Sequence, residues 1–198
     1  MLVCEDGVLA ESEAIVRWAD AAVAPARRLL LDAGEEVAAL CRRFDTGLGL
    51  DGRRLMYAHM LSHRELMLRY NDVGVPAWED RVLRALWRMS GPFASYRIGV
   101  GPRTIERDTP RVRAEFDWVA ERLADGRRYL CGDRFTAADL TFAALAAAVL
   151  VPPEYGTPLP QPDEMPEPVA GEVRAFRDHP AGAFALRLFR EERQVAAG

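Results

Sequence analysis

The chain has 198 residues, 49% of them hydrophobic and 28% charged, with a formal net charge of −4 at pH 7. This length and these proportions of hydrophobic and charged residues are typical of a globular protein that can bury a sizeable core in one or two domains. All 26 basic residues are arginine, and acidic residues are interspersed among them. The sequence therefore shows no cluster of basic residues of the kind that binds nucleic acid. The longest apolar run, residues 140–151, is shorter than the roughly 20 residues of a membrane span.

The cysteines indicate a reducing compartment. Cys4, Cys41 and Cys131 are far apart and show no CxxC or cysteine/histidine metal spacing. No basic stretch leads into an apolar segment at the N-terminus, as it would in a signal peptide. We therefore expect a cytoplasmic protein whose cysteines are small buried hydrophobes rather than nucleophiles.

The N-terminal segment predicts a hairpin followed by a helix. The Asp-Gly pair at residues 6–7 lies between short apolar runs, which indicates a two-residue turn between strands at 1–4 and 8–9. A helix should follow with Ser12 as its N-cap. Residues 21–34, interrupted by a proline, are expected to be a linker.

From residue 35 onward, apolar residues recur at helical spacing. The predicted helices cover residues 35–46, 51–70, 77–90, 109–124, 136–151 and 169–194, the last with a bend at His179-Pro180. The predicted buried faces carry Val37, Leu40, Cys41 and Phe44 in the first helix and Val112, Phe116, Val119 and Leu123 in the fourth. Residues 91–101 should be irregular, and 152–168, with seven of the 13 prolines, should be an extended loop.

One helix start is specified more completely than any other. In Phe-Thr-Ala-Ala-Asp-Leu at 135–140, Thr136 is a good N-cap and Asp139 can return a hydrogen bond to its backbone N–H. The residues that follow are almost wholly apolar up to Val151. We therefore expect a central helix that is buried on every side.

Three segments together resemble the glutathione S-transferase family. Residues 2–15 combine the hairpin with Leu-Ala-Glu-Ser-Glu-Ala-Ile, residues 129–140 end in the capping sequence, and residues 177–182 read Arg-Asp-His-Pro-Ala-Gly. They occur in the family's order. The resemblance implies a mainly α fold, with an all-helical glutathione S-transferase C-terminal domain over 35–198. A β-hairpin plus helix, the remnant of a thioredoxin-like domain, precedes it over 1–24.

The resemblance also implies that most of the thioredoxin-like domain is missing. The family's thiol-activating Tyr, Ser or Cys lies near the start of that domain, so no residue inherits the role and we assign no catalytic residue. Met1 stands where the family has the apolar residue after its cis-proline. We therefore expect that the start has been assigned too late, which translation of the upstream DNA in frame would test.

Glu11 and Ser12 match the family's glutathione-binding pair. A helix N-terminus offers free N–H groups and the positive end of the helix dipole, which suit a carboxylate. The γ-glutamyl carboxylate of glutathione would bind the N–H and hydroxyl of Ser12, and its ammonium group would bind Glu11. The alternative is that Ser12 only caps the helix and Glu11 is a surface charge.

The equivalent of helix 51–70 lines the electrophile pocket in this family, which makes Tyr57, His63 and Arg64 candidate pocket residues. The alternative is a polar stripe that faces solvent. His59 and His63 are four residues apart, as in a metal-binding pair, but no third ligand has suitable spacing, so we expect no metal.

The resemblance implies a glutathione S-transferase-like protein that conjugates or reduces hydrophobic electrophiles with glutathione, if a complete N-terminal domain exists. The alternative is a non-catalytic helical binding or assembly module derived from the same fold. Glutathione binding would discriminate the two. An isolated hairpin is marginally stable and has free edges, so residues 1–24 are expected to pack loosely or to contribute to a homodimer.

Overall fold

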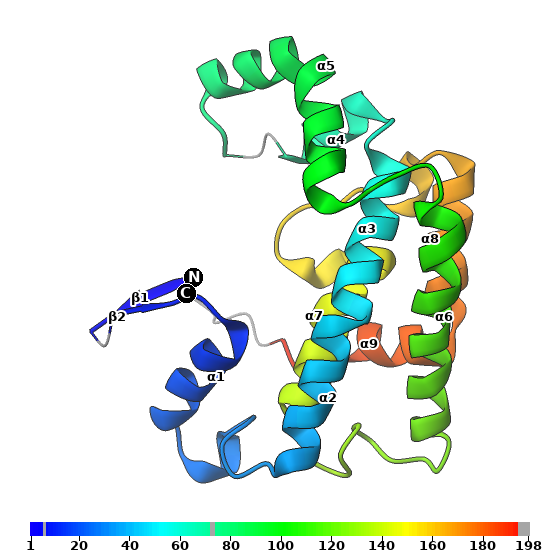
Figure 1. The fold of residues 1–198 in the computed structure, drawn as a ribbon. Coiled ribbons are helices and arrows are strands. Elements are labelled where there is room, and N and C mark those ends of the chain that lie inside the picture. Colours follow the sequence, from blue (N-terminus) through cyan, green and yellow to red (C-terminus); the bar gives the residue numbers. More distant parts are fainter. Residues whose placement is uncertain (6, 72–73, 194–198) are drawn as a thin grey trace.

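The computed structural model describes residues 1–5, 7–71 and 74–193, which form a small hairpin followed by a helical body (Figure 1). The elements are β1 (Leu2–Cys4), β2 (Gly7–Leu9), α1 (Ser12–Ala21), η1 (Pro25–Arg27), α2 (Glu35–Thr46), α3 (Leu48–Met60), α4 (Arg64–Asn71), α5 (Ala77–Ile98), α6 (Thr104–Leu123), α7 (Ala137–Leu150), η2 (Pro153–Tyr155), η3 (Pro162–Glu164), α8 (Glu167–Asp178) and α9 (Pro180–Glu191). The expected mainly α fold is confirmed. Among the described helices, none is long and apolar enough to cross a membrane.

Helix α7 lies at the centre of the body, in contact with α2, α3, α8 and α9 (Figure 1). The ring of Phe142 on α7 lies 5.3 Å from that of Phe44 on α2 and 5.8 Å from that of Phe116 on α6. All three side chains are fully buried. The predicted buried faces of α2 and α6 are therefore correct, with Leu123 at the end of α6 only half-buried.

The predicted start of α7 is confirmed. One carboxylate oxygen of Asp139 accepts from the N–H and the hydroxyl of Thr136, both at 2.9 Å. The other oxygen accepts from the N–H of Leu130 at 2.8 Å, so Asp139 also fixes the preceding loop. Burial raises the pKa of Asp139. The expectation that α7 is buried on every side is wrong, because Leu140 and Ala144 are exposed.

Three predicted helix boundaries are wrong. The expected helix 51–70 breaks at residues 61–63, between α3 and α4. Helix α5 continues to Ile98, so most of the expected irregular segment 91–101 is helical. Helix α6 starts five residues before the predicted cap, at Thr104, whose hydroxyl accepts from the Gly101 N–H at 2.8 Å and fixes the earlier start.

The predicted turn consists of residues 6 and 7, of which residue 6 lies outside the described residues, and the strands pair differently from this prediction. Cys4 pairs with Gly7, so Gly7 belongs to β2 instead of the turn, at a positive φ of 113° that glycine tolerates. Ser12 is the first residue of α1, and Glu11 occupies the N-cap without a side-chain cap bond. Ser12 therefore does not cap the helix.

Asp20 anchors α1 to the helical body. Its carboxylate accepts from the backbone N–H groups of Leu29, Leu30 and Leu31 at 2.9, 2.7 and 2.8 Å. The carbonyl of Leu29 in turn accepts from the N–H of Ala137 at the start of α7, at 2.8 Å. Part of the predicted linker 21–34 is thus fixed between two helices. Burial opposes ionisation, but the three N–H donors hold the pKa of Asp20 below its usual range.

We expect Asp20→Asn to lower the free energy of unfolding by roughly 2 kcal/mol at pH 7, because an amide cannot satisfy the three donors. A carboxyl whose folded pKa is depressed stabilises the fold above its unfolded pKa, about 3.9 for Asp. That stabilisation is lost as the pH falls through the folded pKa. Urea unfolding of both proteins from pH 7 to pH 3 should show the difference shrinking below about pH 4.

The matched control is Asp32→Asn, because the Asp32 side chain is 70% exposed and pairs with the guanidinium of Arg28 at the surface. We expect this variant to change stability by less than about 0.5 kcal/mol. If the difference in the free energy of unfolding between the wild type and Asp20→Asn stayed constant from pH 7 to pH 3, the role of the Asp20 charge would be contradicted.

Candidate functional site

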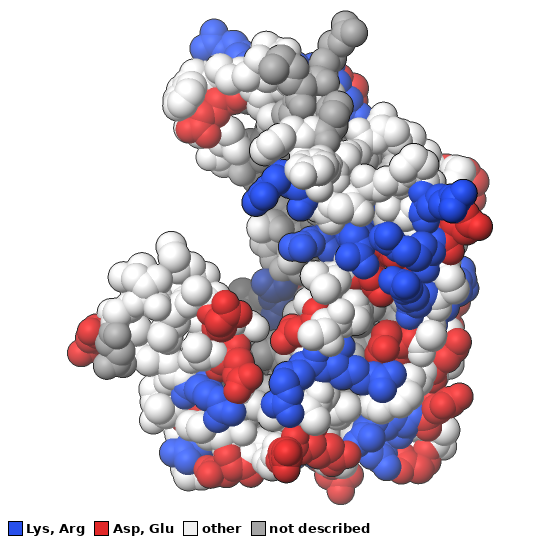
Figure 2. Space-filling model, in the orientation of Figure 1, with Lys and Arg blue, Asp and Glu red and all other residues white. Residues whose placement is uncertain are grey.

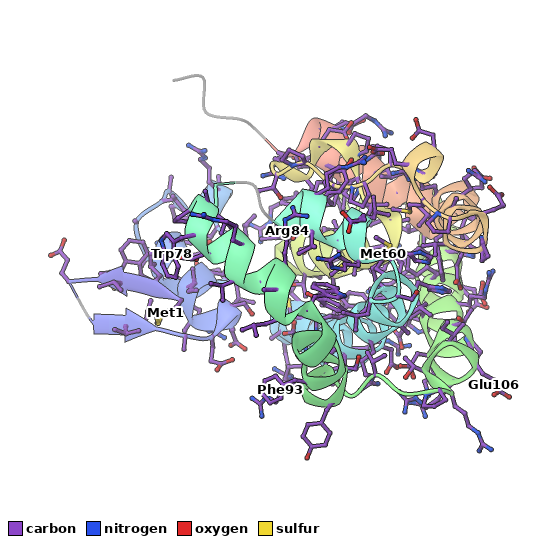
Figure 3. All side chains as sticks on the ribbon, turned by 90° about the horizontal axis from the view of Figure 1, so that it is seen from above. Met1, Met60, Trp78, Arg84, Phe93 and Glu106 are labelled. Atoms are coloured by element: carbon purple, nitrogen blue, oxygen red, sulfur yellow. The ribbon has the colours of Figure 1, made fainter. Side chains whose placement is uncertain are left out.

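A cavity of about 490 Å³ opens between α3, α4, α7 and the proline-rich loop. Its wall is largely apolar and methionine-rich. It is lined by Gly49, Arg53, Met56, Tyr57, Met60, Met67, Tyr70, Ala144, Leu145, Ala147, Ala148, Val151, Tyr155, Thr157, Pro158, Leu159 and Pro160. In the view from above, Met60 lies in the middle of the helical body, whereas Trp78 and Phe93 on α5 lie at its edge (Figure 3). This cavity, called the apolar pocket below, has the lining of a small-molecule site.

Helical spacing places α3 along one wall of the apolar pocket. Gly49, Arg53 and Tyr57 are four residues apart and therefore share one face of the helix. On the opposite wall, Ala144 and Ala148 of α7 have short side chains that leave the space open. The exposure of Ala144 on α7 is thus explained by the pocket, which this residue lines.

Arg177 holds the third wall in place. Its guanidinium donates to the carbonyls of Leu150 and Val151 at 2.8 and 2.7 Å and to the side-chain oxygen of Gln161 at 2.9 Å. These bonds hold the first part of the proline-rich loop, residues 152–168, on both sides of Tyr155 and residues 157–160, which line the pocket. Burial lowers the pKa of Arg177.

Glu11 and Ser12 lie exposed at the start of α1. Burial and the negative charges of Glu13 and Glu11 raise the pKa of Asp45 on α2. Asp45 lies near the end of α2, and Gly49, in the first turn of α3, lines the apolar pocket. Figure 2 shows the molecule hollowed between the lobe of the hairpin and α1 and the lobe of α4 and α5.

The structure separates the three candidate electrophile residues. Tyr57 lines the apolar pocket. His63 and Arg64 instead line a different groove beside Asp163 and Glu164. Arg64 donates to the carbonyl of Arg84 at 3.1 Å and so ties α4 to α5. The break between α3 and α4 is the reason, because it turns residue 63 away from the face of α3.

The histidine pair considered for a metal is also separated. Nε2 of His59 lies 2.6 Å from Oε2 of Glu172 on α8, behind the apolar pocket. Burial opposes ionisation of Glu172, but this contact holds its pKa below the usual range. Within 1–5, 7–71 and 74–193, no group of three or more His, Cys, Asp or Glu side chains could hold a metal ion.

Sequence reasoning missed most of the pocket wall. Met56, Met60 and Met67 have the helical spacing of ordinary core residues, and Leu159 lies in the proline-rich loop. The sequence signal for this wall is the recurrence of Gly49, Arg53 and Tyr57 at intervals of four residues. A glycine, a cation and a phenol on one helical face do not form a stripe of core residues.

Residues 102–171 match the family model described as Glutathione S-transferase, C-terminal domain. The matched stretch contains α6, α7 with its capping residues, the proline-rich loop and the start of α8. No curated protein and no solved structure matches the chain.

Proposed function

We propose that the chain is a glutathione S-transferase-like protein, from the premise that residues 102–171 of its helical body match the glutathione S-transferase C-terminal domain. The apolar pocket takes a hydrophobic electrophile, and Glu11 and Ser12 at the start of α1 take glutathione. The observation that carries the proposal is the apolar pocket, with Tyr57 in its wall, in a chain whose residues 102–171 match the glutathione S-transferase C-terminal domain.

The start of α1 suits both charges of the γ-glutamyl group. Its carboxylate meets the N–H groups and the positive dipole end of the helix together with the Ser12 hydroxyl. Its ammonium group meets an acidic surface that includes Glu11 and Asp45. Glu13 is less available, because Arg17 donates to it at 2.8 Å.

Conjugation needs more than these two sites. The nucleophile is a thiolate, and a free thiol has a pKa of about 8.5, so a donor must stabilise the charged sulfur. The family resemblance assigns that role to no residue of this sequence. We therefore propose binding of glutathione and an electrophile by this chain, and conjugation where a complete thioredoxin-like domain accompanies it. A cytoplasmic location and a homodimer belong to the same proposal.

Calorimetric titration with glutathione and with S-hexylglutathione tests the proposal. The hexyl chain should enter the apolar pocket, and each buried methylene contributes about 0.8 kcal/mol, so we expect at least about tenfold tighter binding of the alkylated compound. Ala148→Phe should fill the pocket and remove this gain while glutathione binding stays unchanged. Ser12→Ala should weaken both ligands.

The matched control is Ala183→Phe, the same substitution at an exposed alanine of α9 outside the apolar pocket. We expect wild-type affinities for this variant. Equal affinities of the wild type for glutathione and S-hexylglutathione would refute the use of the pocket for an electrophile.

A second candidate function is the non-catalytic binding or assembly module. It is favoured by Trp78, Val82 and Leu86 on α5, which are 62, 49 and 50% exposed at a spacing of four residues. Such an apolar helical face on the surface is typical of a contact with another macromolecule. A folded protein that gives no heat with glutathione would support this alternative. Turnover of a chlorinated aromatic substrate would instead reveal a thiol-activating group.

A further inference from the structure

Three arginines follow one another along one side of α6. Arg103, Arg107 and Arg111 are exposed and recur at intervals of four residues, so each is the neighbour of the next on the helix surface. At a rise of about 1.5 Å per residue, their positions are about 6 Å apart along the helix axis. Figure 2 shows basic side chains gathered on this face of the molecule, over α3 and the start of α6. These three residues are called the arginine row below.

Two carboxylates lie beneath the arginine row. The side chain of Asp108 is fully buried and that of Asp51 on α3 is 14% exposed, whereas those of Arg107 and Arg111 are 45 and 56% exposed. Asp108 accepts from Arg107 at 2.5 and 2.8 Å and from Arg54 at 3.0 Å. These bonds hold the pKa of Asp108 below its usual range. The negative charges therefore face the protein, and the guanidinium groups face the surface.

The two outer members of the arginine row keep their donors available. The guanidinium of Arg111 lies 4.0 Å from Asp51 and 3.9 Å from Asp108, which is beyond hydrogen-bond length. The guanidinium of Arg103 has no hydrogen bond or ion pair to any residue within 1–5, 7–71 and 74–193. Glu106 is the exposed acidic residue of this stretch of α6, and it offsets one of the three exposed cations. The side of α6 that carries the row therefore has an excess of positive charge.

From this arrangement we propose that the arginine row is a docking surface for an acidic helix of a partner protein. Carboxylates at every fourth residue of a helix are also about 6 Å apart along its axis, so the two rows of charge match in spacing. They would accept from Arg103 and Arg111 and leave the bonds of Arg107 to Asp108 in place. The net charge of −4 at pH 7 opposes the approach of a nucleic acid, which favours a protein partner. The row lies outside the lining of the apolar pocket, so the proposal is independent of that site.

Fluorescence anisotropy with two labelled peptides tests this proposal. One peptide has five repeats of Glu-Ala-Ala-Ala, which place the carboxylates along one side of a helix. The other has five repeats of Glu-Ala-Ala-Ala-Ala, which carry the same charge but distribute it around the helix. We expect the first peptide to bind about fivefold more tightly at low salt. Added salt should weaken its binding, because the contacts are exposed ion pairs.

A double variant, Arg103→Gln with Arg111→Gln, should weaken the first peptide about tenfold. Arg107 stays unchanged in this variant, because its loss would remove a partner of the buried Asp108. The matched control is Arg134→Gln with Arg190→Gln, which removes two charges at exposed arginines outside the arginine row. The net charge of the two double variants is identical, so we expect the control to bind the first peptide as the wild type does.

Three results would overturn the proposal. Equal affinities for the two peptides, or equal weakening by the two double variants, would show that the binding follows overall charge and not the arginine row. Tighter binding of a labelled oligothymidylate than of either peptide, lost with Arg103 and Arg111, would assign the row to a nucleic acid. A wild-type dimer that dissociates in the variant of Arg103 and Arg111, measured by light scattering, would assign it to a second copy of this chain.

Discussion

Gly182→Ala is expected to lower the free energy of unfolding by about 3 kcal/mol or more. Gly182 lies in the first turn of α9, where a Cβ atom would overlap the carbonyl oxygen of Phe176 and come within 2.9 Å of its carbonyl carbon. Both atoms belong to the backbone of α8 and cannot rotate away like a side chain. The methyl group would therefore force apart two helices that join at His179-Pro180, and urea unfolding would measure the loss.

Gly171→Ala is the matched control. Gly171 lies within α8, and the nearest atom to an added Cβ is a carboxylate oxygen of Glu167 at 3.9 Å, on a flexible side chain. Alanine reduces the conformational entropy of the unfolded chain, so we expect stabilisation by roughly 0.5–1 kcal/mol. The substitution of glycine by alanine should thus change the free energy of unfolding in opposite directions at Gly182 and Gly171. Equal changes in the free energy of unfolding at both positions would show that the backbone of Phe176 does not exclude a Cβ atom at residue 182.

Asp139→Ala is expected to destabilise the protein by about 4 kcal/mol, because it removes the acceptor of three hydrogen bonds. The N–H groups of Leu130 and Thr136 would then lie buried without that partner. Asp139→Asn keeps one acceptor oxygen and should fall between this variant and the wild type. Urea unfolding at pH 7 would rank the three proteins.

Asp133→Ala is the control for Asp139→Ala, since it removes the same side chain from an exposed position in the loop before α7. Its effect should stay below about 0.5 kcal/mol. A loss below about 1 kcal/mol for Asp139→Ala would contradict the role of Asp139 as the acceptor that fixes this loop.

Local rules predicted the parts of the fold that local interactions decide. The Thr136–Asp139 contact spans three residues, and the buried stripes of α2 and α6 follow helical periodicity. The same rules failed where tertiary contacts prevail. Helix α5 continues to Ile98 through most of the segment expected to be irregular, and α6 starts at Thr104, which is buried.

The sequence by itself determined the helical fold class, the start of α7 and the resemblance that the match over residues 102–171 supports. Only the tertiary structure decided which side chains meet around the apolar pocket. Its walls come from α3 and α4 and from α7 and the proline-rich loop, two stretches of the chain that are separated by α5 and α6. Periodicity assigns a residue to a face of its own helix, but the three-dimensional packing of helices decides what that face meets. For this reason Tyr57 lies in the pocket with Arg53, whereas His63 and Arg64 lie in another groove.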